Sequence, residues 1–195
     1  MTTANKLTIL RILLIPIMII VLYIDGLKIQ TAFLNMDVQQ IIFAGLFVLA
    51  SLTDFLDGYI ARKYNQITTF GKFLDPIADK VLVFTALLYL MVQMPNRVGI
   101  WGVMIIIVRE FLVTGVRLIA VEHGQVIAAS SLGKYKTLTT MLAIIMFLFN
   151  DFGLSMINAN LIWITNIIYY AAIFFTVWSG FDYLYKNREI IFESM

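Results

Sequence analysis

The stretch Ser51–Lys80 reads SLTDFLDGYIARKYNQITTFGKFLDPIADK and lies between two strongly apolar segments. It contains four aspartates: Asp54, Asp57, Asp75 and Asp79. A charged side chain at the centre of a membrane span costs about 2.5–3.5 kcal/mol, so carboxylates that persist there usually serve a function. The apolar flanks and the four carboxylates predict a helical membrane protein whose chemistry takes place at these aspartates.

The overall composition supports a membrane protein. The chain has 195 residues, of which 61% are hydrophobic and 13% charged, and its mean hydropathy is +0.90. Soluble domains are about half apolar and a quarter charged. The length fits a single domain over residues 1–195, and a net charge of +2 does not suggest a nucleic-acid binder. Because cysteine is absent, disulfides, thiolate metal sites and cysteine nucleophiles are excluded.

Six segments are apolar and long enough to cross a bilayer, which takes about 20 residues in a helix. They are Leu7–Ile24, Gln40–Arg62, Pro76–Met94, Val98–Val121, Lys134–Asn150 and Leu161–Tyr185. Helices satisfy their own backbone hydrogen bonds in lipid. The predicted fold class is therefore all-α, a polytopic integral membrane bundle of six transmembrane helices.

The distribution of lysine and arginine predicts the orientation of this bundle in the cell membrane. Of the 14 basic residues, two (Lys28 and Arg97) fall on one side and two (Arg109 and Arg117) inside the fourth span. The other ten fall on the opposite side: Lys6, Arg11, Arg62, Lys63, Lys72, Lys80, Lys134, Lys136, Lys186 and Arg188. Cytoplasmic loops are enriched in basic residues. We therefore expect both termini and the aspartate stretch to face the cytoplasm.

The spacing of the aspartates places them in two pairs. Asp54 and Asp57 are three residues apart, and Asp75 and Asp79 are four apart, so each pair shares one face of a helix. All-oxygen ligands suit Mg²⁺, Mn²⁺ or Ca²⁺, and two such ions about 3.5–4 Å apart can clamp a phosphoryl transfer. The alternative is that these are solvated charges near helix ends.

Small residues accompany the carboxylates and leave room for a bulky ligand. Gly58 and Ala61 lie on the face of the first pair, and Gly71 lies on the face of the second if this stretch is helical. Pro76 is compatible with a helix if it falls in the first turn, where its missing N–H leaves no bond unmade.

The stretch resembles the motif D-x2-D-G-x2-A-R-x8-G-x3-D-x3-D of the CDP-alcohol phosphotransferases, a family of six-helix membrane enzymes. The matching positions are Asp54, Asp57, Gly58, Ala61, Arg62, Gly71, Asp75 and Asp79. The resemblance implies that an alcohol attacks the β-phosphate of a CDP-linked substrate and that CMP leaves. It further implies two divalent cations, Mg²⁺ or Mn²⁺. Their ligands would be Asp54, Asp57 and Asp75, with Asp79 as a further ligand or the general base.

The same resemblance assigns residues to the CDP moiety. These are Gly58, Ala61, Arg62 and Gly71, together with Asn5 and Thr8 from the N-terminal segment NKLTILRILLIP. An alternative role for Asn5 or Thr8 is to cap the first helix.

Two basic stretches point to a phosphorylated acceptor. In REFLVTGVRL (Arg109–Leu118), two arginines and Glu110 lie in apolar sequence, as either an internal ion pair or an anion pocket. In SSLGKYKT (Ser130–Thr137), Lys134 and Lys136 are predicted in the first turn of a helix. Cations oppose the helix dipole there but suit a bound anion; the alternative is membrane anchoring. The predicted phosphate ligands are Arg109, Arg117, Lys134 and Lys136.

These stretches also resemble the branch of the family that uses CDP-diacylglycerol as donor and sn-glycerol 3-phosphate as acceptor. The resemblance implies a homodimer. Alternatives within the family are cardiolipin synthesis or a serine or inositol phosphate acceptor. A divalent-cation carrier would also have carboxylates in its cavity. It is disfavoured because the sequence shows no inverted repeat.

Overall fold

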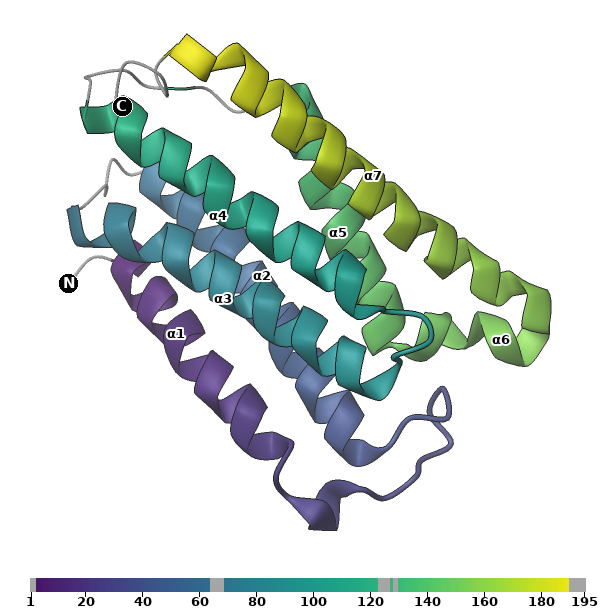
Figure 1. Ribbon diagram of the computed structural model, residues 1–195. Helices are drawn as coiled ribbons and strands as arrows, with labels where there is room; N and C mark the ends of the chain where they lie inside the picture. Colours follow the sequence, from purple (N-terminus) through teal and green to yellow (C-terminus); the bar gives the residue numbers. More distant parts are fainter. Residues whose placement is uncertain (1–2, 64–68, 123–126, 128–129, 190–195) are drawn as a thin grey trace.

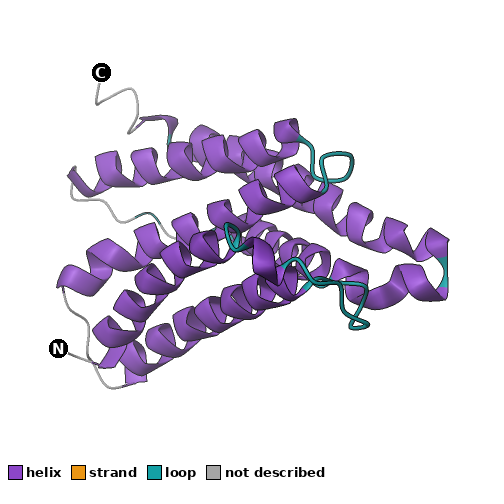
Figure 2. Ribbon diagram, turned by 90° about the horizontal axis from the view of Figure 1, so that it is seen from below, coloured by secondary structure: helices purple, strands orange, loops and turns teal. Residues whose placement is uncertain are grey.

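The computed structural model describes residues 3–63, 69–122, 127 and 130–189, without the side chains of residues 3–4 and 55–73. It contains six long helices: α1 (Thr3–Val21), α2 (Val38–Lys63), α3 (Thr69–Gln93), α4 (Ile100–Glu122), α5 (Ser131–Leu148) and α7 (Ile162–Lys186). The short elements are η1 (Asp25–Leu27), η2 (Asn150–Gly153), α6 (Leu154–Ile157) and η3 (Ala159–Leu161). No strand occurs in the described residues (Figure 2), so the all-α fold is confirmed.

The third helix differs most from its predicted span. It begins at Thr69, seven residues before Pro76, so the expectation that Pro76 lies in a first turn is wrong. The helix continues through the proline although most residues before it, such as Thr69, Gly71 and Asp75, are weak helix formers. As a result Gly71, Asp75 and Asp79 lie on one uninterrupted helix, which places them on one face.

The long helices alternate in direction. The start of α1, the end of α2, the start of α3 and the ends of α4 and α7 lie at one end of the bundle (Figure 1). The α3–α4 connection, η1 and α6 lie at the other end. In this arrangement α1 packs on α2 and α3, while α7 packs on α4 and α5.

The largest buried cluster of side chains includes residues of all six long helices. Met18 of α1, Phe43 and Phe47 of α2, Leu82 of α3 and Ile144 of α5 are all at most 1% exposed. Burying a side chain of this kind stabilises a fold by about 1.5–3 kcal/mol. This cluster holds the helices that carry the aspartates at fixed positions.

One helical stretch, Ala159–Lys186, is long and apolar enough to cross a membrane, with a mean hydropathy of 1.7. A second span results if Ser131–Leu148 and Asn150–Ile157, which are bent by 68° at their junction, count as one. Among the described residues, these two stretches are the candidate membrane spans by length and composition. Helix α4 is also apolar but has three charged residues, Arg109, Glu110 and Arg117, in its interior.

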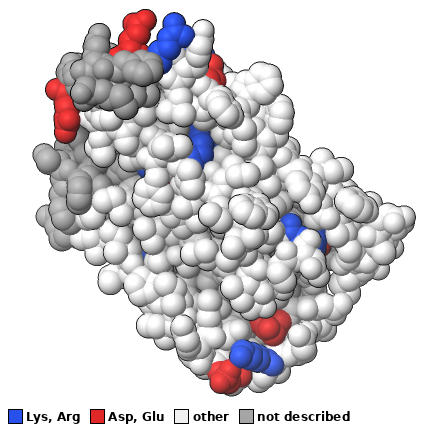
Figure 3. Space-filling model, viewed as in Figure 1, with Lys and Arg blue, Asp and Glu red and all other residues white. Residues whose placement is uncertain are grey.

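The outward surface is nevertheless largely apolar. Trp101 on α4 is 75% exposed, Val92 on α3 is 72% exposed and Phe181 on α7 is 72% exposed. In the view of Figure 3, most of the charged surface lies at the top left and at the bottom, and the surface between is largely uncharged apart from a few small blue and red areas. Apolar surface of this extent marks a protein that contacts lipid or other proteins.

A buried ion pair holds the end of the bundle opposite the aspartates. Arg97 Nη1 lies 2.7 Å from Asp151 Oδ2, and Arg97 Nη2 donates to Asp151 Oδ1 at 2.9 Å. Arg97 Nε donates to Asn166 Oδ1 at 3.0 Å, and its guanidinium lies 4.8 Å from the ring centroid of Phe147. One arginine thus ties the α3–α4 connection to α5, η2 and α7.

The segment that presents Asp151 has an unusual backbone. Residues 150–153 all have positive φ, from 49° to 70°, a region that costs free energy for residues other than glycine. Asn150 Nδ2 donates to the Leu34 carbonyl at 2.7 Å, which connects the segment to the α1–α2 connection. The strained conformation of this segment is held by the Asn150–Leu34 hydrogen bond and the Arg97–Asp151 ion pair.

We expect Arg97→Ala to destabilise the protein by about 3–5 kcal/mol, because it leaves the buried Asp151 carboxylate without its cation. Unfolding of the purified protein in detergent, followed by circular dichroism, measures this change. Lys28→Ala is the matched control, since Lys28 forms an exposed pair with Asp25 at the same end. Equal stability of Arg97→Ala and Lys28→Ala would contradict the role assigned to Arg97.

Candidate active site

Helix α1 contributes polar side chains that hold two of the aspartates. Arg11 is fully buried, and its Nη1 lies 2.8 Å from Asp54 Oδ1. Thr8, also buried, donates its hydroxyl proton to Asp75 Oδ1 at 2.6 Å. Sequence reasoning assigned Thr8 and Asn5 to the CDP moiety. In the structure Thr8 orients Asp75, and Asn5 is buried near the start of α1.

A small cavity of about 150 Å³ brings residues of both aspartate pairs together. It is lined by Asp54 of α2 and Asp79 of α3, and by Glu110 of α4 and Lys136 of α5. The Asp54 side chain remains 45% exposed although Arg11 binds it. Two carboxylates predicted to share one site therefore do face a common space, although they lie 25 residues apart in sequence.

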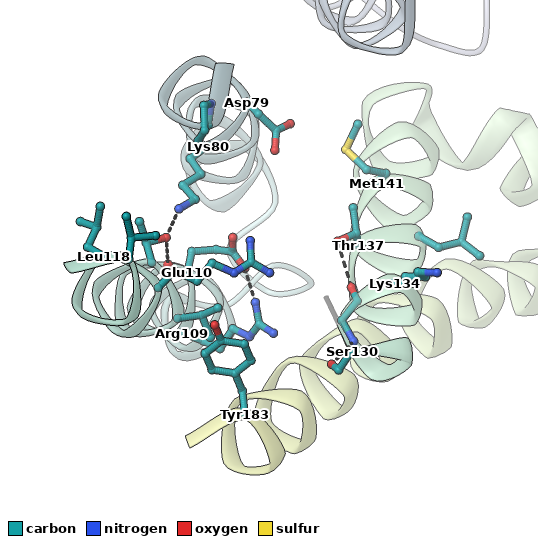
Figure 4. A pocket seen from close by; sticks show the side chains of 17 residues that line it. Asp79, Lys80, Arg109, Glu110, Leu118, Ser130, Lys134, Thr137, Met141 and Tyr183 are labelled. Carbon is teal, nitrogen blue, oxygen red and sulfur yellow. Dashed lines mark hydrogen bonds and ion pairs between the residues drawn. The ribbon is translucent and has the colours of Figure 1, made fainter. Parts of the chain in front are cut away.

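A larger cavity of about 830 Å³ adjoins the small one (Figure 4). Asp79, Lys80 and Glu110 line both cavities, so the two spaces meet at these residues. The larger cavity is also lined by Arg109, Thr114 and Arg117 of α4, Ser130 and Lys134 at the start of α5, and Tyr183 of α7. Its volume is in the range of small-molecule sites, which run from about 300 to 1,000 Å³.

Glu110 is the centre of the charge network in this region. Its Oε1 atom lies 2.6 Å from Lys136 Nζ and 2.9 Å from Arg109 Nη1. Arg109 also donates from Nη2 to the buried Ser179 hydroxyl of α7 at 3.1 Å. Glu110 therefore pairs with one arginine of the RE pair and with a lysine of α5, and Arg109 extends this network to α7.

Arg117 and Lys134 differ from Arg109 and Lys136 in their partners. Both side chains are exposed and line the larger cavity, and neither has an ion pair with a described carboxylate. The guanidinium of Arg117 lies 5.9 Å from the ring centroid of Tyr183. Of the four cations that the sequence indicated for a phosphate, these two remain available to an anion in the cavity.

The start of α5 lies beside Arg109. Ser130 caps the helix by accepting a hydrogen bond from the Gly133 N–H at 3.1 Å. A Cβ atom added to Gly133 would lie 3.9 Å from Arg109 Nη2, an ordinary van der Waals distance. The first turn of α5 therefore lies close to the Arg109 guanidinium. Because α5 begins at Ser131, Lys134 lies in the first turn, whereas Lys136 lies in the second; the prediction that both occupy the first turn is wrong for Lys136.

Sequence reasoning missed several residues of the site. Arg11 and Lys80 were interpreted as basic residues of the cytoplasmic side, yet Arg11 binds Asp54 and Lys80 Nζ donates to the Thr114 hydroxyl inside the cavity. Tyr183 was also missed, because no local sequence pattern distinguishes it from the other tyrosines of the chain.

Some predicted residues lie outside the described side chains. Asp57, Gly58, Ala61 and Arg62 belong to α2, and Gly71 belongs to α3, but only their backbone is described. Their assignments to metal and CDP remain predictions.

The donor chemistry of the site suits hard divalent cations, since its ligands are carboxylate oxygens. The described side chains form no group of three or more metal-ligating residues. Asp54 and Asp79 share a cavity, Asp75 accepts from Thr8, and Asp57 is outside the described side chains. The described carboxylates thus supply part of a metal site.

Comparisons with known proteins place the chain in one family. Residues 1–178 match the model of the CDP-alcohol phosphatidyltransferases. A CDP-diacylglycerol–glycerol-3-phosphate 3-phosphatidyltransferase of Bacillus subtilis is 41% identical over 189 residues, covering 96% of this chain and 95% of the relative. Proteins of the same name from Rickettsia bellii (40% identical; 92% and 91% covered) and Haemophilus influenzae (37%; 97% and 95% covered) are also similar. The chain therefore belongs to the CDP-alcohol phosphatidyltransferase family, as its aspartate motif had indicated.

Proposed function

We propose that this protein transfers the phosphatidyl group of CDP-diacylglycerol to sn-glycerol 3-phosphate, giving phosphatidylglycerophosphate and CMP. The observation that carries the proposal is the larger cavity, in which a carboxylate, Asp79, lies with Arg117 and Lys134, two cations that form no ion pair with a described carboxylate. An acceptor with a hydroxyl at one end and a phosphate at the other matches this distribution of charge. The names of the relatives support the same substrates.

Asp79 is the proposed general base. It lines both the small cavity shared with Asp54 and the larger cavity of the acceptor. A base at this junction accepts the proton of the acceptor hydroxyl as its oxygen bonds to the β-phosphorus, while the bond from that phosphorus to the CMP oxygen breaks. For this transfer the acceptor hydroxyl must lie within hydrogen-bond distance of the Asp79 carboxylate, about 2.6–3.2 Å.

The acceptor phosphate is proposed to lie against Arg117 and Lys134. Lys134 is in the first turn of α5, where the helix dipole also favours an anion. Arg109 and Lys136 act differently, because both are held by Glu110. They position the carboxylate between the two cavities and maintain a positive field around the acceptor.

Asp54, Asp57, Asp75 and Asp79 are the proposed ligands of two divalent cations, Mg²⁺ or Mn²⁺, which would offset the charge of the pyrophosphate. Arg11 and Thr8 hold Asp54 and Asp75 in place from α1. The CDP moiety is assigned to Asn5, Gly58, Ala61, Arg62 and Gly71 on the basis of the family motif.

The six long helices are proposed to span the cytoplasmic membrane, with both termini and the active site on the cytoplasmic side and the protein as a homodimer. Support comes from the alternating direction of the helices, the exposed apolar side chains and the excess of lysine and arginine at the aspartate end. Lipid around the bundle gives CDP-diacylglycerol access from the side.

The direct test is CMP release by the purified protein in detergent. We expect release with CDP-diacylglycerol, glycerol 3-phosphate and Mg²⁺ or Mn²⁺, and none after chelation with EDTA until either ion is added back. Phosphatidylglycerol, serine and inositol phosphate serve as alternative acceptors in separate reactions. Release with one of these instead would refute the acceptor assignment, and full release in EDTA would refute the metal assignment.

Asp79→Asn and Asp54→Asn should each lower the turnover number at least 100-fold. The first removes the base, whose contribution is typically 10²–10⁴-fold, and the second removes a carboxylate from the small cavity. Steady-state CMP release, with folding checked by thermal unfolding, measures the change. Asp182→Asn is the control, because Asp182 pairs with Lys186 away from both polar cavities. Wild-type turnover in Asp79→Asn would exclude it as the base.

Arg117→Ala and Lys134→Ala should each raise the Michaelis constant for glycerol 3-phosphate about tenfold or more, since each removes a charge-assisted hydrogen bond. The Michaelis constant for CDP-diacylglycerol should change much less. Lys186→Ala, which removes an exposed lysine of α7 outside the cavity, is the control. A parallel rise for both substrates would show that Arg117 and Lys134 do not distinguish the acceptor.

A further inference from the structure

Tyr183 has a buried hydroxyl that the described residues leave without a hydrogen-bond partner. The residue lies near the end of α7, is only 4% exposed and lines the larger cavity. A buried hydroxyl without a partner costs free energy, and such groups in native proteins call for a specific explanation. A ligand that accepts a hydrogen bond from this hydroxyl removes that cost.

The position of Tyr183, and not the missing partner alone, indicates a ligand. Three other buried hydroxyls also lack partners: those of Thr140, Thr165 and Tyr169. Thr140 lines the small cavity, whereas Thr165 and Tyr169 line neither of the two polar cavities. Of these four residues, Tyr183 is the one that lines the larger cavity, the space assigned to the acceptor (Figure 4).

The surroundings of Tyr183 define the chemistry of that ligand. Its ring packs against the guanidinium of Arg117, at 5.9 Å from centroid to Cζ. Ser179, four residues earlier and so on the same face of α7, accepts a hydrogen bond from Arg109 Nη2 at 3.1 Å. One face of α7 therefore contacts both arginines that line the cavity, and the Tyr183 hydroxyl lies in a region of positive charge.

We propose that the Tyr183 hydroxyl donates a hydrogen bond to the phosphate group of the acceptor and helps to select a phosphorylated acceptor. A phosphate oxygen accepts hydrogen bonds only, and a phenol supplies one donor, so the pair is complementary. The ring of Tyr183 also lies beside the Arg117 guanidinium and so restricts its orientation. This inference rests on the proposed function, because it assigns a residue to the acceptor of that reaction.

The test compares Tyr183→Phe with Tyr169→Phe in the full-length protein in detergent. Both changes remove one buried, unpartnered hydroxyl from α7, but only Tyr183 lines the cavity. In Tyr183→Phe the Michaelis constant for glycerol 3-phosphate should rise about tenfold or more, the effect of losing a hydrogen bond to a charged group. The Michaelis constant for CDP-diacylglycerol and the unfolding temperature should stay near those of the wild type.

A second measurement separates the phosphate from the glycerol part of the acceptor. Inorganic phosphate, used as a competitive inhibitor of glycerol 3-phosphate, should bind Tyr183→Phe correspondingly more weakly. An unchanged inhibition constant would place the hydroxyl on the glycerol part and overturn the assignment to phosphate. If Tyr183→Phe does not fold, Tyr183→Met, which also lacks the donor, should show the same selective change.

The outcomes distinguish this inference from the proposed function. A wild-type protein that releases no CMP with glycerol 3-phosphate refutes the proposed function before any variant is compared. An active wild type with an unchanged Michaelis constant in folded Tyr183→Phe overturns the inference alone. The same rise in Tyr169→Phe also overturns it, because the effect would then come from packing in α7.

Discussion

The contact of Glu110 with Lys136 and Arg109 is the interaction on which the site depends. It joins α4 to α5 directly, and through the Arg109–Ser179 hydrogen bond it joins both to α7. Removing charges from water is costly, and only close geometry with further hydrogen bonds compensates for this cost. This condition is fulfilled here, because the Glu110 carboxylate contacts two cations and Arg109 also donates a hydrogen bond to the Ser179 hydroxyl. The result is that Glu110 is held where the two cavities meet.

The same principle governs the other buried charges. Arg11 of α1 meets Asp54 of α2, and Arg97 meets Asp151 at the opposite end. Each pair joins segments that are far apart in sequence, so the buried charges also determine which helices are neighbours. At the aspartate end this arrangement leaves Arg117 and Lys134 on the cavity surface, and a phosphate can supply the missing negative charge.

Much of the fold follows from local pattern. The six long helices lie within a few residues of the predicted spans except at the start of α3, where Pro76 suggested a later beginning. Hydrophobic content and turn residues identify helices reliably in such a chain, because few other structures satisfy the backbone in apolar surroundings. Proline is a weaker signal than it first appears, since a helix with sufficient packing on both sides can continue through it.

The sequence by itself determined the all-α class, the family and the aspartates of the proposed active site, because a motif of eight fixed positions within 26 residues is a local property. It could not determine which cations are neutralised. That Glu110 binds Arg109 and Lys136 and leaves Arg117 available depends on the packing of α4 against α5 and α7. Arg11, Lys80 and Tyr183 likewise enter the site only through tertiary structure. Their neighbours lie 30 or more residues away in sequence, and the direction of each side chain is set by the helix that packs against it.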